Sequence, residues 1–194
     1  MYLITITQII HWTQLLWLLL CAVWLGSAPF AKRTIHKQSL ESRIEQSALF
    51  AVGLYLLFGS PSTPDWFNQP VFRVTVPIAL AGLGITVCGV ALSIWARLTL
   101  GENWSASATV KQDHTLIVRG PYQAVRHPIY TGLLVALLGS ALQRGLLRSF
   151  LAVIICAVSL WMKVAVEEDF MVRRFGQEYL RYRREVSALV PFLF

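Results

Sequence analysis

The chain has 194 residues, of which 56% are hydrophobic and only 14% are charged, and its mean hydropathy is +0.57. Because soluble domains carry about 25% charged residues, this composition excludes an ordinary soluble domain and predicts an integral membrane protein. The formal net charge of +7 is typical of a basic face against anionic lipid, so we expect the lipid bilayer and no nucleic acid as a partner.

Long uncharged runs predict the membrane spans in chain order. A spanning helix needs about 20 predominantly apolar residues, and Lys, Arg, Asp and Glu are absent from 1–31, 46–64 and 74–96. The later apolar runs are shorter, which predicts a tight helical hairpin that turns near 143–147. We therefore expect an all-α integral membrane protein, a single membrane domain with about five transmembrane helices over residues 8–31, 44–61, 72–97, 127–143 and 147–166.

Positive charge is unevenly divided between the loops. If the loops alternate between the two sides of the membrane, every Lys and Arg except Arg73, Arg144 and Arg148 falls on one side. The positive-inside rule then predicts an outside N-terminus and a cytoplasmic C-terminus. On this orientation the polar segments 98–130 and 163–194 are both cytoplasmic.

Packing is the simplest interpretation of the cysteines and glycines in the spans. The three cysteines lie singly inside apolar runs, and the four histidines have no zinc-type spacing, so we expect no metal site. In the third span, Gly82, Gly84 and Gly89 indicate close helix packing.

The connection 98–130 concentrates polar and turn-forming residues between two apolar runs. Its stretch 115–118 is rich in β-branched residues and is followed by Gly120 and Pro121, which predicts extended chain closing in a turn. Extended backbone offers free N–H and C=O groups to a small molecule. The alternative is a loop that only bridges two spans.

Near the C-terminus, apolar and charged residues alternate over 161–175 and predict a helix that leaves the bilayer and ends at Gly176. Beyond it, Tyr179 and Tyr182 are expected to pack the C-terminal tail.

Two adjacent carboxylates, Glu167 and Glu168, fall where this helix reaches the membrane edge. An ionised group there is costly unless it is paired or solvated. Asp169 can pair with Arg173, four residues on, but the only local partner of Glu167 is Lys163, four residues before it and in the less favourable orientation. A cationic ligand is therefore a candidate partner for Glu167.

These motifs together resemble a known family. The sequence GPYQAVRHPIYTG at 120–132, the pair Glu167-Glu168 and the sequence FGQEYLRY at 175–182 resemble the isoprenylcysteine carboxyl methyltransferases and their phospholipid methyltransferase relatives, over about residues 100–191. The resemblance implies methyl transfer from S-adenosylmethionine to a lipid-linked acceptor at the cytoplasmic membrane face. The implied acceptor is the carboxylate of an isoprenylated cysteine, and the alternative is a phospholipid or another lipid amine.

The same resemblance implies the site residues, because the family binds its cofactor through this loop and the C-terminal helix. Glu167 and a basic residue, Lys163 or Arg173, are the catalytic candidates; Lys163 stands where similar eukaryotic enzymes carry an arginine. His127 or Arg126 can bind a carboxylate, although Arg126 can equally anchor a lipid headgroup. The positions that match the family's cofactor contacts are His114, Thr115, Leu116, Ile117, Tyr122, His127, Pro128, Ile129, Tyr130 and Glu167, with Glu168 beside them.

Two other classes of function remain open on the sequence. A membrane reductase that uses NADPH has a similar C-terminal region in the sterol reductases, but no Gly-rich dinucleotide fingerprint occurs here. A membrane scaffold without catalysis would use only the basic face. Binding of S-adenosylhomocysteine or of NADPH distinguishes the three classes.

Cysteine labelling tests the predicted orientation. In a variant without the native cysteines, we expect Lys111→Cys to resist a membrane-impermeant maleimide in intact cells and to react after permeabilisation. The control Arg73→Cys, on the predicted outer side, should react in intact cells. Reaction of Lys111→Cys in intact cells would overturn the orientation.

Overall fold

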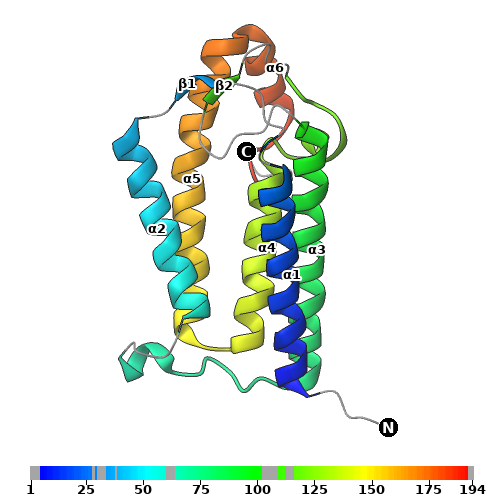
Figure 1. Ribbon diagram of the computed structural model, residues 1–194, viewed down its shortest axis with the longest axis vertical. Helices are drawn as coiled ribbons and strands as arrows, with labels where there is room; N and C mark the ends of the chain where they lie inside the picture. Colours follow the sequence, from blue (N-terminus) through cyan, green and yellow to red (C-terminus); the bar gives the residue numbers. More distant parts are fainter. Residues whose placement is uncertain are drawn as a thin grey trace.

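The computed structural model describes residues 5–27, 29, 34–37, 39–59, 64–101, 109–111 and 116–191, and for 34–37 and 109–111 the backbone only. Five long helices lie side by side and alternate in direction along the chain, and a short sixth helix covers one end of the bundle (Figure 1). The helices are α1 (Ile6–Ser27), α2 (Leu40–Phe58), α3 (Val76–Leu100), α4 (Pro128–Arg144), α5 (Leu147–Phe175) and α6 (Gln177–Glu185). α1 begins at one end of the bundle, and α6 lies at the other end.

The helices confirm the prediction of an all-α membrane protein. Three of them, α1, α3 and α5, are long and apolar enough to cross a membrane. Two others fit that measure less well, since α2 carries charged residues in its first turns and α4 has only 17 residues, so a count of five spans stays a prediction. The predicted hairpin is correct, because α4 ends at Arg144 and α5 begins at Leu147. α5 continues without a break through the predicted polar helix and ends before Gly176, whose φ is +54°.

Glycines bring α3 and α4 into backbone contact. A Cβ added at Gly89 would lie 2.4 Å from the carbonyl oxygen of Gly132, and a Cβ at Gly139 would lie 2.5 Å from the carbonyl oxygen of Gly82. Such small residues allow the close approach that drives helix association in lipid. The predicted packing role is thus confirmed for Gly82 and Gly89, whereas a Cβ at Gly84 would meet no atom within 4 Å.

Hydrogen bonds across this interface fix the register of α4. Ser93 Oγ donates to the carbonyl of Ile129 at 3.1 Å, and Gln143 Nε2 donates to the carbonyl of Ala79 at 3.1 Å. These bonds hold both ends of α4 against α3, so the first turn of α4 has a fixed position.

Two buried arginines donate hydrogen bonds to carbonyl oxygens at the ends of helices. Arg97 is 2% exposed and donates to the carbonyls of Ser27 at 2.8 Å and Gly101 at 2.9 Å, at the ends of α1 and α3. Arg148 is 3% exposed and donates to the carbonyl of Gly59 at 3.2 Å, just after α2. The predicted spans 72–97 and 147–166 put both charges at the ends of spans; they are buried because the last carbonyls of a helix need donors.

A small antiparallel sheet links the two connections at the α6 end. Strand β1 (Thr34–Lys37) pairs with β2 (Thr109–Lys111), beside the C-terminal part of α5 in Figure 1. The extended segment was predicted at 115–118, but 116–118 belong to neither a helix nor a strand, and residue 115 lies outside the described part. The short 3₁₀ turns η2 (Asp65–Asn68) and η4 (Gly120–Gln123) complete the connections.

The α3–α4 contact can be tested with one added methyl group. We expect Gly89→Ala to lower the unfolding temperature in detergent, because its Cβ meets backbone atoms of α4 and overpacking costs about 1–3 kcal/mol. Gly84→Ala is the matched control on the same helix and should leave stability equal or higher, since alanine favours helix over glycine. Equal unfolding temperatures for the two variants would contradict this account of the interface.

Candidate active site

The start of α4 and the C-terminal half of α5 carry the charged residues of the site. Pro128 occupies the first turn of α4, where its missing N–H costs nothing. His127 precedes it in a non-helical conformation. This turn places the side chains of Arg126, His127 and Tyr130 next to the adjacent glutamates of α5.

Glu167 has partners at the start of α4 in addition to Lys163 on its own helix. The Tyr130 hydroxyl donates to Glu167 Oε1 at 2.5 Å, and His127 Nδ1 lies 3.5 Å from Glu167 Oε2. The His127 and Tyr130 rings are stacked, with centroids 5.6 Å apart and planes within 5°. Lys163 is the only partner within its own helix that the sequence spacing offers to Glu167, because such spacing cannot register a contact from another helix. The side chain of Glu167 keeps 21% exposure, so a ligand can still reach it.

Lys163 lies one helical turn before Glu167, and its Nζ is 5.5 Å from the centre of the Tyr130 ring. This distance is within the range of a cation–π contact. The ammonium, the phenol and the Glu167 carboxylate thus form one continuous group, and we call Lys163, Glu167, His127 and Tyr130 the carboxylate cluster.

Glu168 points into a different environment. Arg126 contacts Glu168 Oε1 through Nε at 2.7 Å and Nη2 at 2.6 Å, and Arg183 Nε lies 3.2 Å from Oε2. The remaining Arg126 nitrogen, Nη1, donates to the carbonyls of Arg183, at 3.0 Å, and of Val186. The side chain of Arg126 is therefore 9% exposed and engaged with protein through all its nitrogens.

The tail after α6 runs alongside the start of α4. The backbone N–H of Arg126 donates to the carbonyl of Ser187 at 2.8 Å, and that of His127 donates to the carbonyl of Ala188 at 3.0 Å. Val125 and Ser187 form an isolated parallel bridge. The tail thus satisfies backbone donors that the first turn of α4 leaves open.

Two tyrosines join α6 to η4. The Tyr182 hydroxyl donates to the carbonyl of Tyr122 at 2.5 Å, and Tyr122 packs with Ala96 and Ile129. Burial raises the pKa of Tyr122 and the pKa of Tyr182 well above their ordinary value, so Tyr182 remains a neutral donor. The predicted packing role of Tyr179 and Tyr182 is confirmed, since both are buried under the tail.

The other predicted site residues are placed as follows. Leu116 and Ile117 are half-buried beside η4, and Pro128 and Ile129 are buried in the packing beneath the site. His114 and Thr115 lie outside the described residues. Arg173 is 75% exposed and pairs with Asp169 at 2.8 Å, as predicted for that pair, so the structure does not bring it to the carboxylate cluster. Their roles stay predictions.

Sequence reasoning missed Arg183 altogether. The spacing of Arg183 and Glu168 gives no local signal, because the two residues lie on different helices separated by the turn at Gly176. The adjacency of the two glutamates was the available clue, since neighbouring side chains on a helix point in different directions and need separate partners.

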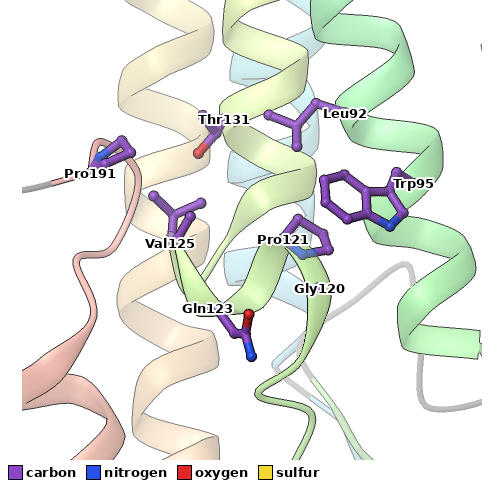
Figure 2. A pocket seen from close by; sticks show the side chains of 9 residues that line it. Leu92, Trp95, Gly120, Pro121, Gln123, Val125, Thr131 and Pro191 are labelled. Carbon is purple, nitrogen blue, oxygen red and sulfur yellow. The ribbon is translucent and has the colours of Figure 1, made fainter.

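An apolar groove of about 340 Å³ lies next to this region. Figure 2 shows Leu92 and Trp95 of α3, Pro121 and Val125 near η4, and Thr131 of α4 around it. No member of the carboxylate cluster is among its lining residues. The groove is therefore a separate feature of the surface between α3 and α4.

Comparison with known proteins gives consistent similarities. The sequence profile described as phospholipid methyltransferase matches residues 78–178. A protein-S-isoprenylcysteine O-methyltransferase of Schizosaccharomyces pombe is 30% identical over 58% of this chain and 49% of its own length. The B isoform of that enzyme in Arabidopsis thaliana is 29% identical over 78% of this chain and 81% of its own. The chain thus spans about half the length of the yeast relative.

The fold has a solved counterpart. The structure of a eukaryotic intramembrane Ras methyltransferase, isoprenylcysteine carboxyl methyltransferase, superposes with a TM-score of 0.60 at 21% identity. The match covers 96% of this chain and 67% of that one. At this identity the likeness establishes a shared fold.

The tie between α6 and η4 can be tested by removing one oxygen. We expect Tyr182→Phe to lower the free energy of unfolding by about 1–3 kcal/mol, because the buried carbonyl of Tyr122 loses its donor. Since the bond needs the neutral phenol and its pKa is raised in the folded state, the difference from wild type should persist below pH of about 10 and shrink only above it. Tyr179→Phe is the matched control, since the Tyr179 hydroxyl makes no hydrogen bond to the described residues; an equal loss there would contradict this role.

Proposed function

The chain belongs to the phospholipid methyltransferase family, and on this basis we propose that it transfers a methyl group from S-adenosylmethionine to a lipid-linked acceptor at the cytoplasmic membrane face. The proposed acceptor is the carboxylate of an isoprenylated cysteine, in keeping with the names of the relatives that it matches. The carboxylate cluster is the observation that carries this proposal. It places an accessible anion, an aromatic face and an ammonium together at the end of α5.

The cluster fits the polar groups of S-adenosylmethionine. His127 Nε2 is buried and, although it is 3.4 Å from Glu168 Oε1, it lacks the geometry of a hydrogen bond with any described group, so it has capacity left for a ligand. Glu167 can accept from a ligand amine or ribose hydroxyl, while the Tyr130 ring already has His127 and Lys163 against it. When bound, S-adenosylmethionine would supply an electrophilic methyl group on a sulfonium cation.

Lys163 is the better candidate for orienting the acceptor. Its ammonium lies over the Tyr130 ring and one turn from Glu167, whereas Arg173 is exposed and paired with Asp169. A carboxylate acceptor is already ionised at neutral pH, so alignment by a fixed positive charge can suffice without a general base.

An amine acceptor is the second candidate, and the family description favours it. A protonated amine must lose its proton before it attacks. Glu167 is proposed to bind the cofactor, so the same carboxylate is not available as that base. This arrangement supports the carboxylate acceptor over the amine.

Calorimetry and turnover measurements distinguish the proposed cofactor-binding role of Glu167 from the proposed acceptor-orienting role of Lys163. We expect Glu167→Gln to weaken S-adenosylhomocysteine binding about 10- to 150-fold, since a charge-assisted hydrogen bond contributes about 1.5–3 kcal/mol. Lys163→Ala should instead reduce methylation of an S-prenylcysteine while cofactor affinity stays within a few-fold, and Arg173→Ala is the exposed control for both readouts.

Several outcomes would contradict the proposal. Wild-type protein that binds NADPH and not S-adenosylhomocysteine would make it a reductase. Methylation of phosphatidylethanolamine but not of the S-prenylcysteine would select the amine acceptor. Unchanged S-adenosylhomocysteine affinity in Glu167→Gln would remove that residue from the cofactor site.

A further inference from the structure

We propose that Glu168 is a positioning residue, which acts with Arg126 and Arg183 as a clamp that holds His127 in the site, and that it does not contact the cofactor. The part of this inference that concerns cofactor binding rests on the proposed function. The part that concerns the position of His127 needs only the ligand-free protein.

Both oxygens of Glu168 face protein cations. Arg126 Nε donates to Oε1 at 2.7 Å, with Arg126 Nη2 2.6 Å from the same oxygen, and Arg183 Nε lies 3.2 Å from Oε2. The side chain is 9% exposed, compared with 21% for Glu167. The two adjacent glutamates therefore have different tasks, with Glu167 open to a ligand and Glu168 closed by protein.

Arg126 extends the clamp to the end of α6. Its Nη1 donates to the carbonyls of Arg183 and Val186, where α6 ends and its last carbonyls lack intrahelical partners. A cation at a helix C-terminus is also favoured by the helix dipole. The two guanidinium groups carry more positive charge than the Glu168 carboxylate alone can balance, and the carbonyl oxygens of α6 compensate for the excess. Arg126 therefore links α5, α6 and the tail.

His127 lies at the centre of this arrangement. Its backbone N–H is bound by the carbonyl of Ala188, and the neighbouring Arg126 is fixed on both its backbone and its side chain. The imidazole is in this way held between the carboxylates of Glu167 and Glu168, with Nδ1 at 3.5 Å and Nε2 at 3.4 Å. Loss of Glu168 would release Arg126 and leave its buried charge uncompensated, which is strongly destabilising locally. The expected result is a displaced His127.

A double-mutant cycle tests whether Glu168 acts through His127. We expect Glu168→Gln to weaken S-adenosylhomocysteine binding about tenfold or more in the otherwise unchanged protein. In the His127→Ala background the same change should have an effect of less than about twofold, because its target is gone. Equal losses in both backgrounds would mean that Glu168 acts on the ligand directly, and would overturn the proposal.

Hydrogen exchange in the ligand-free protein tests the clamp independently of the cofactor. We expect Glu168→Gln to speed exchange in 125–131 and 183–190, while the α4–α5 hairpin at the other end of the bundle keeps wild-type protection. Arg183→Ala should produce a smaller change in the same segments, because Arg126 remains. Asp169→Asn is the control, since it breaks an exposed ion pair on the next residue of the same helix.

The binding and the hydrogen-exchange experiments distinguish failure of the proposed function from failure of the clamp. If wild-type protein does not bind S-adenosylhomocysteine, the proposed function fails while the exchange result still decides the clamp. Unchanged exchange in Glu168→Gln, or an equal change in Asp169→Asn, would overturn the clamp whatever the cofactor result.

Discussion

Two adjacent carboxylates at the end of a long apolar helix impose the main electrostatic constraint on this protein. An ionised group near lipid must be paired or solvated, and neighbouring residues on a helix point in different directions, so Glu167 and Glu168 need separate partners. Glu167 takes Tyr130 and His127 from α4, and Glu168 takes two arginines. Compensation of these charges therefore draws α4, α5, α6 and the tail to one place.

The precision of that meeting depends on apolar packing elsewhere. Backbone contact between Gly89 and Gly132 sets how closely α4 approaches α3, and the bond from Ser93 to Ile129 sets its register. Because Tyr130 follows Ile129 directly, the glycine interface indirectly determines where the phenol meets Glu167. The polar residues of the site are thus positioned by small residues of the α3–α4 interface within the bilayer region.

Much of the fold could be predicted from the sequence because its causes are local. Apolar length gives helices, and glycine in a left-handed conformation ends them, as at Gly145 and Gly176. The partners of the glutamates could not be predicted in this way, since Tyr130 and Glu167 are 37 residues apart and Arg126 and Glu168 are 42 apart. Spacing rules for helices consider neighbours three or four residues away, so they predicted the pair of Asp169 and Arg173 but not the partners that Glu167 and Glu168 find on other elements.

The tail that lies along α4 also affects the order of biosynthesis. Residues 186–188, which bind the backbone of Arg126 and His127, are translated after all five long helices. A nascent chain can insert its helices and form the α3–α4 contact before the tail exists, but it cannot yet hold the first turn of α4 in place. The long helices are thus synthesised before the residues that hold the first turn of α4.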